Sequence, residues 1–352
     1  MEHLPTKHLH GLDHLRTLAI SLVFFFHYRH FAHPDWVDAL GNFGWSGVDL
    51  FFVLSGYLIS APLLAALHAH EPLPLRRFFI HRATRIIPPF LVTVALYFAL
   101  PMFRERSAPA PLWKLLTFTQ NLGLDLRTQG AFSHAWSLCV EEHFYILLPL
   151  ALLAARKWPR ALLCVPPLLF VCGVCTRWVG SLHAVDTVDW YRRVYYPTYQ
   201  RLDPLLLGVA LSAFVTFRPQ FAVQMRARGS WLLALALTVV FGAWLATRDP
   251  HTLFASVAGF PLVAAGYALV VAVAIAWPTP RSQLTSLIAK LSYAIYLLHK
   301  GVIHLVQTAM GDRAPATLTF FICIAATLVA AWMMRVAVER PALALRARWQ
   351  SA

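Results

Sequence analysis

Several ionisable residues lie within the apolar stretches of this 352-residue sequence, where a membrane helix would carry them into hydrocarbon. A charged or titratable side chain is costly in that environment, so such positions are usually functional. The first group combines imidazole, carboxylate and guanidinium side chains, and comprises His27, Asp49, Glu141, Glu142, Arg201, Asp203 and His299. The second group contains arginines, and comprises Arg16, Arg82 and Arg85, with Arg76 and Arg77 nearby.

The first group has the side chains of a general acid–base site. A carboxylate that orients a histidine makes the imidazole a competent base. We therefore predict that His27 is the base and that Asp49, Glu141 or Glu142 orients it. Neighbouring residues on a helix point about 100° apart, so only one of Glu141 and Glu142 is expected to face the site.

The second group suits a phosphorylated ligand, because guanidinium binds phosphate through bidentate, charge-assisted hydrogen bonds. Arg16 and His27 lie on one predicted helix, about 16 Å apart at 1.5 Å per residue. Two structural alternatives remain open. Arg82 and Arg85 could be ordinary anchors at a helix start, and Asp49 could be the structural partner of an arginine.

The sequence also contains residue types that bind metals. His27, His30 and His33 are spaced three apart, but histidines at that spacing drift off one helical face, and we predict no metal site. The five cysteines lie mostly in apolar stretches, and the pair Cys172 and Cys175 has no second pair. We predict neither a zinc site nor a disulfide framework.

The elements that must position these residues are membrane helices. The chain is 59% hydrophobic and 13% charged, whereas a soluble domain has about 25% charged residues. We predict an all-α polytopic membrane protein in which residues 1–352 form one membrane domain. About ten transmembrane helices are expected, near residues 12–30, 46–67, 86–103, 136–155, 161–180, 204–217, 231–247, 253–277, 287–308 and 317–338.

The Lys and Arg residues indicate the orientation of these helices. They are more frequent in the loops on the side of the N-terminus, which predicts that both termini are cytoplasmic. The first group then lies near the outer face and the arginine group near the cytoplasmic face. Contact with lipid explains most of the net charge of +14, with a smaller share left for an anionic substrate, and we predict no nucleic-acid partner.

Seven segments carry a resemblance to a known family. They are GLDHLRTLAISLVFFFHY (11–28), GWSGVDLFFVLSGYLIS (44–60), RRFFIHRATRIIPPF (76–90), HAWSLCVEEHFYILLPL (134–150), YQRLDPLLLGVALS (199–212), KLSYAIYLLHKGV (290–302) and VERP (338–341). In this order they resemble the acyltransferase-3 family of bacterial membrane acyltransferases, which modify cell-surface and exported glycans.

The resemblance implies a ten-helix protein of the inner (cytoplasmic) membrane with several passes through the lipid bilayer. It implies no bound cofactor. The co-substrate would be a cytoplasmic acyl-CoA, by default acetyl-CoA, and the acceptor would be a carbohydrate hydroxyl on the outer side, as in a surface polysaccharide or a lipid-linked glycan.

The resemblance also gives the candidate residues roles. Arg82 and Arg85 would bind the CoA phosphates, and Arg16 would guide the pantetheine arm or stabilise the thioester carbonyl. His27 would deprotonate the acceptor hydroxyl or carry the acyl group transiently. The family often has Trp and Pro after the histidine of the ninth span, whereas this chain has Lys300 and Gly301 after His299, which we expect to alter the acceptor side.

Other functions remain open at this point. The acceptor could be a lipid or a small molecule rather than a glycan. Histidine and glutamate within a membrane also suit a proton-coupled transporter, although no internal repeat is visible. We expect acceptor specificity in the outer loops 104–131 and 181–203, with Arg201, Asp203 and His299 as acceptor-side candidates.

Overall fold

The computed structural model describes residues 9–158 and 160–351. Regular structure within these residues is helical, and the one strand-like pairing is an isolated bridge between Pro109 and Ala131. The predicted all-α class is therefore confirmed for the described chain.

All ten predicted membrane segments fall on long helices. These helices are α1 (His10–Tyr28), α3 (Gly47–His68), α4 (Leu75–Ala99), α6 (Trp136–Lys157), α7 (Ala161–Leu182), α9 (Asp203–Phe217), α11 (Gly229–Ala246), α12 (Phe260–Ala276), α13 (Gln283–Met310) and α14 (Ala316–Met334). The shorter helices are α2 (Trp36–Gly41), α5 (Leu112–Leu116), α8 (Thr187–Trp190), α10 (Pro219–Ala227) and α15 (Arg340–Ser351). Single turns of 3₁₀ helix lie at η1 (Gly44–Ser46), η2 (Pro101–Phe103), η3 (Ser133–Ala135), η5 (Thr198–Gln200) and η7 (Gly311–Arg313), and π-helical turns at η4 (Tyr191–Tyr195), η6 (Ala255–Gly259) and η8 (Arg335–Glu339).

Seven helical segments in the described chain are long and apolar enough to cross a membrane, and α9 with α10 would form an eighth, bent by 104°. Helices α1 and α13 are not among the seven. Both carry polar side chains, including His27, His299 and Lys300, that lie inside the bundle. The structure supports a multi-pass membrane protein, while ten crossings and cytoplasmic termini stay predictions.

Helix α4 differs from its predicted span, because it begins at Leu75 rather than near residue 86. The arginines between Arg76 and Arg85 lower the hydropathy of this stretch, but arginine is a good helix former. Arg82 and Arg85 therefore lie within a continuous helix, and both line a cavity in the bundle. The helix therefore extends beyond the predicted apolar span, because hydropathy reports apolar surface rather than helix length.

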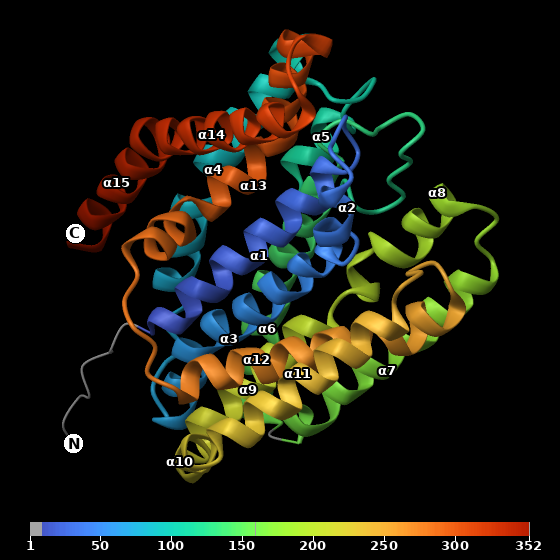
Figure 1. The fold of residues 1–352 in the computed structure, drawn as a ribbon. Helices are drawn as coiled ribbons and strands as arrows, with labels where there is room; N and C mark the ends of the chain where they lie inside the picture. The colour runs from blue at the N-terminus through green and yellow to red at the C-terminus, as the bar shows by residue number, and fades with distance from the viewer. Residues whose placement is uncertain (1–8, 159, 352) are drawn as a thin grey trace.

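Helix α1 lies in the middle of the bundle, with α4, α13 and α14 on one side and α3, α9, α11 and α12 on the other (Figure 1). The closest approach is between α3 and α9. A Cβ atom built on Gly56 would lie 2.2 Å from the Leu205 carbonyl oxygen, and one on Gly208 would lie 2.2 Å from that of Val53. Small residues allow membrane helices to pack at such distances.

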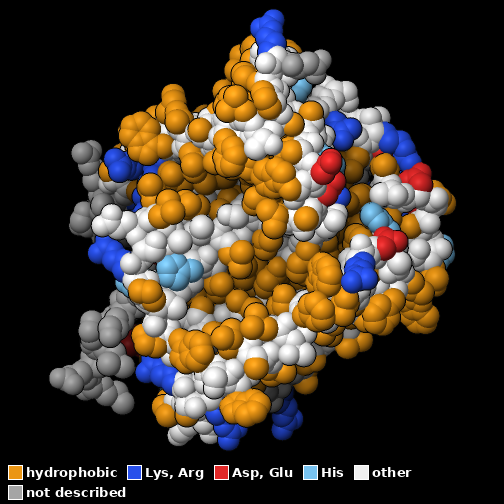
Figure 2. All heavy atoms as spheres, viewed as in Figure 1, with side chains coloured by type: hydrophobic (Ala, Val, Ile, Leu, Met, Phe, Trp, Pro, Cys, Tyr) orange, Lys and Arg blue, Asp and Glu red, His pale blue; other side chains and the backbone are white. Residues whose placement is uncertain are grey.

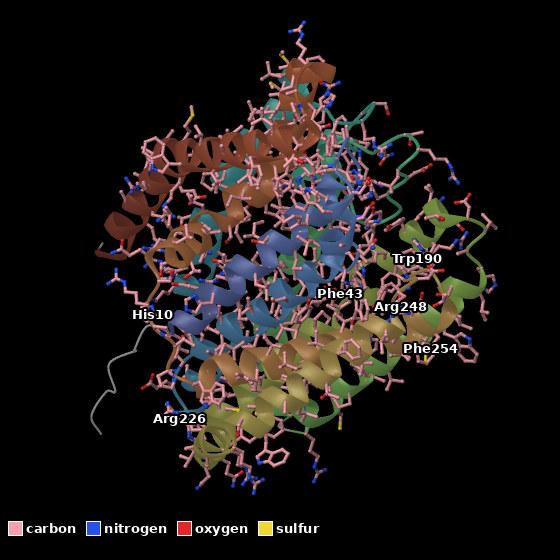
Figure 3. The ribbon with its side chains drawn as sticks, viewed as in Figure 1. His10, Phe43, Trp190, Arg226, Arg248 and Phe254 are labelled. Carbon is pink, nitrogen blue, oxygen red and sulfur yellow. The ribbon has the colours of Figure 1, made fainter. Side chains whose placement is uncertain are left out.

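The surface has the character of a membrane protein. Hydrophobic side chains cover most of the face shown in Figure 2, and Lys and Arg side chains lie mainly around its rim. Figure 3 places His10 and Arg226 at one end of the helices and Trp190, Arg248 and Phe254 at the other. The loops that follow α4 and α7 thus lie at the end opposite to the start of α1.

Candidate active site

A narrow cavity of about 110 Å³ lies between α1, α3, α4, α6 and α13, and we call it the inner cavity. Its polar lining includes Arg16, Arg82, Arg85 and Glu141, which come from three different helices. Three guanidiniums face one carboxylate, so the cavity is electropositive. The predicted arginine group is therefore brought together in space.

The two neighbouring glutamates are separated as their helical spacing predicts. Glu141 lines the inner cavity and accepts a hydrogen bond from the Ser55 hydroxyl. Glu142 does not line this cavity. Arg82 places its guanidinium 5.6 Å from the centre of the Tyr145 ring, a cation–π contact that orients the arginine inside the cavity.

A second cavity of about 720 Å³ opens toward the other end of the helices, and we call it the outer cavity. Its lining combines aromatic rings with basic and imidazole side chains. It comprises Val23, Phe26, His27, His30, Phe31, Trp45, Val48, Glu105, Arg106, Leu126, Arg127, Gly130, Ser133, His134, Trp136, Val188, Tyr191, Tyr195, Tyr196, Tyr296, Lys300 and His304.

His27 and His299 form a hydrogen-bonded pair at the inner end of this cavity. The distance from His27 Nδ1 to His299 Nε2 is 2.8 Å, and His299 Nδ1 lies 2.8 Å from the Tyr296 carbonyl oxygen and 3.1 Å from that of Ile295. Carbonyl oxygens only accept, so His299 Nδ1 carries a hydrogen and its Nε2 accepts from His27 Nδ1. These partners assign the His27 hydrogen to Nδ1 and leave its Nε2 with a lone pair.

The partner of His27 therefore differs from the one expected. The sequence predicted that Glu141, Glu142 or Asp49 would orient this imidazole, but among the described residues its hydrogen-bond partner is His299. The Tyr296 carbonyl oxygen fixes the tautomer of His299, and His299 in turn fixes the tautomer of His27, the role that a carboxylate was expected to fill. This carbonyl is available because the His299 side chain folds back along its own helix, α13.

A third histidine, His134, completes the cluster and was missed by the sequence analysis. Its ring centre lies 5.7 Å from that of His27 and 5.0 Å from that of His299. It precedes α6 in the η3 turn, where no helical periodicity indicates which way a side chain points. The only signal was its place at the start of the HAWSLCVEE segment.

The inner and outer cavities share a common wall. Val48 and Tyr296 line both of them. The Tyr296 hydroxyl donates to the His134 carbonyl oxygen and lies 2.6 Å from Ser137 Oγ. Helix α1 passes both cavities, since Arg16 lines the inner one and His27 the outer one.

Asp49 and the two acceptor-side candidates Arg201 and Asp203 lie behind this lining. Arg201 donates to Asp49 over 2.7 Å, and both side chains are 1% exposed. Arg201 also stacks 4.7 Å from the Tyr195 ring centre. Asp203 pairs over 3.1 Å with Arg177, which the sequence analysis did not single out. The contact between Asp49 and Arg201 matches the alternative in which Asp49 is the structural partner of an arginine. Arg201 in turn supports Tyr195, which lines the outer cavity.

Lys300 reaches the outer cavity from α13 and pairs with Glu105 over 2.7 Å. Glu105 also accepts from the Phe132 backbone N–H over 3.2 Å. Burial alone raises the pKa of the Glu105 carboxyl, but the charge and hydrogen bond of Lys300 outweigh burial and lower that pKa below its usual range. Gly301 is required next to this pair, because a Cβ there would lie 2.4 Å from the Phe103 ring.

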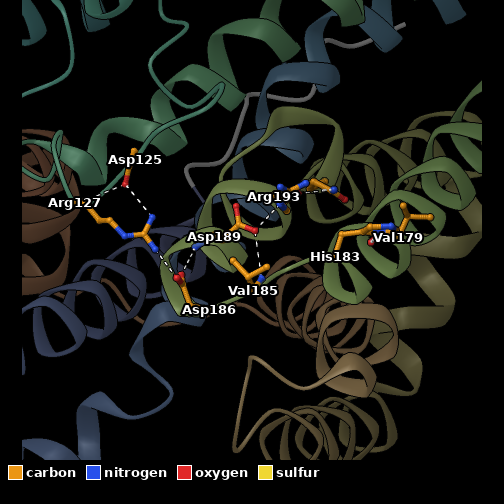
Figure 4. A network of polar contacts seen from close by, with 9 residues as sticks. Asp125, Arg127, Val179, His183, Val185, Asp186, Asp189 and Arg193 are labelled. Atoms are coloured by element: carbon orange, nitrogen blue, oxygen red, sulfur yellow. Dashed lines mark hydrogen bonds and ion pairs between the residues drawn. The ribbon is translucent and has the colours of Figure 1, made fainter.

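Figure 4 shows polar contacts within and between the segments 104–131 and 181–203, and Arg127 among these residues lines the outer cavity. Arg127 donates to Asp186 over 2.5 Å and lies 3.8 Å from Asp125. Next to it, Arg193 donates to Asp189 over 2.6 Å, which lowers the pKa of the Asp189 carboxyl. The Arg127–Asp186 pair connects the loops 104–131 and 181–203, in which acceptor specificity was predicted, while the other pairs lie within one loop each.

No group of three or more His, Cys, Asp or Glu side chains in residues 9–158 and 160–351 has the arrangement of a metal site. The five cysteines are free thiols. His30 accordingly bonds to the Phe26 carbonyl oxygen, and His33 lies 3.4 Å from Asp38.

Comparison with known proteins gives a consistent picture. Residues 9–336 match the Acyl_transf_3 family, described as an acyltransferase domain. The O-acetyltransferase OatA of Staphylococcus aureus is 29% identical over 333 residues, which cover 86% of this chain and 52% of the relative. The peptidoglycan O-acetyltransferase OatA of Listeria monocytogenes is 26% identical over 367 residues, which cover 95% of this chain and 56% of the relative. The chain thus spans about half the length of these relatives, and no solved structure matches it.

Proposed function

Because this chain belongs to the acyltransferase-3 family, we propose that it moves an acetyl group from cytoplasmic acetyl-CoA to a hydroxyl of a carbohydrate outside the inner membrane. Both relatives are named O-acetyltransferases, and one is named for peptidoglycan. The alternatives, a lipid or small-molecule acceptor and a proton-coupled transporter, have no contact in the structure that favours them.

One observation carries the proposal. Two cavities of different chemistry share a wall inside the bundle, and the base faces one while the arginines face the other. An acyl transfer across a membrane needs a donor site and an acceptor site that meet within reach of one base. The shared wall of Val48 and Tyr296 provides that meeting point.

The inner cavity is the proposed donor site. Arg82 and Arg85 are positioned to bind the phosphates of CoA. Arg16 and His27 lie about 16 Å apart along α1 at 1.5 Å per residue, a distance that the extended pantetheine arm spans. Arg16 then lies between the phosphate end and the base, where it can guide the pantetheine arm toward His27.

The outer cavity is the proposed acceptor site. His27 Nε2 takes the proton of the acceptor hydroxyl while that oxygen attacks the thioester carbonyl carbon. The carbon–sulfur bond breaks, the sulfur leaves as the thiolate of CoA, and His27 returns the proton to it. The products are an O-acetyl ester and free CoA. His299 keeps the second nitrogen of His27 protonated throughout, as the orienting partner of a catalytic histidine does.

The same lone pair on His27 Nε2 also permits a covalent route, in which the imidazole accepts the acetyl group before the hydroxyl attacks. A covalent route gives ping-pong kinetics, whereas direct transfer requires both substrates to be bound together. Initial rates at several fixed concentrations of each substrate distinguish the two.

The test is release of CoA thiol from acetyl-CoA by detergent-purified protein with a panel of carbohydrate, lipid and small-molecule acceptors. Wild type is compared with His27→Ala and with the control His183→Ala, which alters an exposed histidine bonded to its own helix at Val179. Loss of a general base reduces the rate by about 10² to 10⁴-fold.

Acceptor-dependent release that survives in His183→Ala and is lost in His27→Ala supports the proposal. Unchanged release in His27→Ala refutes the assignment of the base. Release that depends only on a lipid acceptor refutes the carbohydrate assignment and leaves acyl transfer in place.

A further inference from the structure

Positively charged residues outnumber negatively charged residues in the lining of the outer cavity. Its lining contains Arg106, Arg127 and Lys300, with Glu105 as its carboxylate. Its other titratable groups are four histidines and four tyrosines, namely His27, His30, His134, His304, Tyr191, Tyr195, Tyr196 and Tyr296. A cavity lined mainly by one sign of charge between low-dielectric walls attracts ligands of the opposite sign.

Two of these cations already have partners. Lys300 is paired with Glu105, and Arg127 is paired with Asp186. Arg106 forms no ion pair within the described chain, and it lines the cavity together with His30. Its stem packs against Gly130, where a Cβ atom would lie 3.0 Å from Arg106 Cγ. Arg106 is therefore held at the cavity with its charge available.

Lys300 adds a second positive charge at the base of the same cavity. Its side chain is 10% exposed, compared with 2% for Glu105. Glu105 Oε1 is shared between Lys300 and the Phe132 N–H. The other oxygen, Oε2, is buried without a hydrogen-bond partner among the described residues. The Lys300 ammonium has three N–H donors and uses one of them on Glu105, so it retains donors. Ser133 Oγ, at 3.4 Å, takes one of them weakly.

Aromatic rings form another part of the lining of the outer cavity. Tyr191 and Tyr196 are stacked with ring centres 5.4 Å apart, and Trp136 lies 5.5 Å from Tyr196. Such rings bind the apolar faces of sugar rings and present hydroxyl or N–H groups at their edges. The wall and the cations are on one cavity with His27, so a ligand can contact all three.

We propose that the outer cavity selects an anionic saccharide, with the sugar ring against Trp136 and the tyrosines and its carboxylate or phosphate on Arg106 and Lys300. This inference rests on the proposed function for the identity of the cavity as the acceptor site. The new element is that the acceptor is negatively charged. Its negative group would lie next to Arg106, on the side of the cavity formed by the 104–131 loop.

Binding tests the inference without requiring turnover. Fluorescence of the detergent-purified full chain, in which Trp45 and Trp136 line the cavity, is titrated at low salt with trigalacturonate and with the same trisaccharide after reduction of its carboxyls. A second pair, maltotriose 6-phosphate and maltotriose, tests phosphate in place of carboxylate. The variants are Arg106→Gln and the control Arg192→Gln, an exposed arginine that does not line the outer cavity.

The expected result is that wild type binds at least one anionic member about tenfold more tightly than its neutral partner, as one charge-assisted hydrogen bond predicts. The pair that shows the preference identifies the anionic group. Arg106→Gln loses the preference, and Arg192→Gln keeps it. Equal affinities within both pairs, absence of binding, or a preference unchanged in Arg106→Gln overturns the inference.

CoA release measured on the same preparations separates the two proposals. Preferential binding of the anionic sugar without acetyl transfer would refute the proposed function and support the charge selectivity. Acetyl transfer to the neutral and anionic sugars with equal affinity would support the proposed function and overturn the charge selectivity.

Discussion

Replacement of His299 by Phe isolates the role of the partner of His27. The His299 ring is fully buried and lies 6.3 Å from the Phe24 ring centre, so a phenyl ring, which is planar and aromatic like imidazole, is a mild change that removes its nitrogens. His27 Nδ1 then loses the acceptor that lies 2.8 Å away. The His27 tautomer with hydrogen on Nε2, which cannot act as a base, becomes more populated.

The size of the effect follows from the lost hydrogen bond. A buried donor left without an acceptor costs about 1–3 kcal/mol. At 1.36 kcal/mol per factor of ten, that cost lowers the rate constant by about 5- to 150-fold. The Michaelis constant for acetyl-CoA should not change, because His299 does not line the inner cavity.

The assay is CoA release under saturating acceptor, with kcat and KM for acetyl-CoA measured separately. His299→Gln serves as the conservative variant, since its amide oxygen can replace the imidazole Nε2 as acceptor, and it should recover part of the lost kcat. His183→Phe, the same change at an exposed histidine, should behave as wild type. The reasoning is refuted by wild-type kcat in His299→Phe, or by equal losses in His299→Phe and His299→Gln.

Three more predictions concern charged residues. Arg85→Gln should raise KM for acetyl-CoA by about 10- to 150-fold, from about 1.5–3 kcal/mol per charge-assisted hydrogen bond, and should leave KM for acetyl-pantetheine unchanged; equal effects on both donors would contradict a phosphate contact. Asp49→Ala should cost about 3–5 kcal/mol because Arg201 is left buried and unpaired, seen as a lower Tm in detergent that Asp49→Ala with Arg201→Met largely restores; an unchanged Tm in the single variant would contradict this. Glu105 has a lowered pKa, so its pairing with Lys300 stabilises the fold above the ordinary glutamate pKa and is lost as the pH falls through the lowered value. The Tm difference between wild type and Glu105→Gln should therefore close on acidification, and a difference independent of pH would count against the ion pair.

The apolar stretches of the sequence were sufficient to predict where the long helices lie. Each predicted span coincides with a helix because about 20 apolar residues have few alternatives to a helix in lipid. The start of α4 was not predictable in the same way. Arg82 and Arg85 line a cavity rather than facing lipid, and hydropathy treats an inward-facing arginine as a reason to end the span.

The sequence analysis grouped His27 and His299 on the same side of the membrane, and the structure places them in contact. It did not predict that they bond to each other, because 272 positions of chain separate them and a depth along a helix does not specify the direction of a side chain. The assignment of a carboxylate to His27 came from chemical analogy. The alternative left open for Asp49, pairing with an arginine, is the one that its contact with Arg201 matches.

The ion pair of Lys300 was also beyond sequence-based prediction. The position of Lys300 after His299 marked it as a departure from the family pattern, but its partner Glu105 lies in an outer loop with no periodicity. Only the folded chain brings that loop over α13. Contacts between a helix and an irregular loop depend on the whole fold. Residue patterns along the chain can therefore single out a residue such as Lys300 without identifying its partner.

The wall formed by Val48 and Tyr296 also bears on the electrical state of the membrane. A water-filled passage between the two cavities would let protons run down the membrane potential, which drives each charge with about 2.3 kcal/mol per 100 mV. The wall presents the apolar Val48 side chain and a Tyr296 hydroxyl that is already bonded to Ser137 and His134. A thioester threaded past this point would itself fill the opening, so a donor from inside could react with an acceptor outside while the cell keeps its proton gradient.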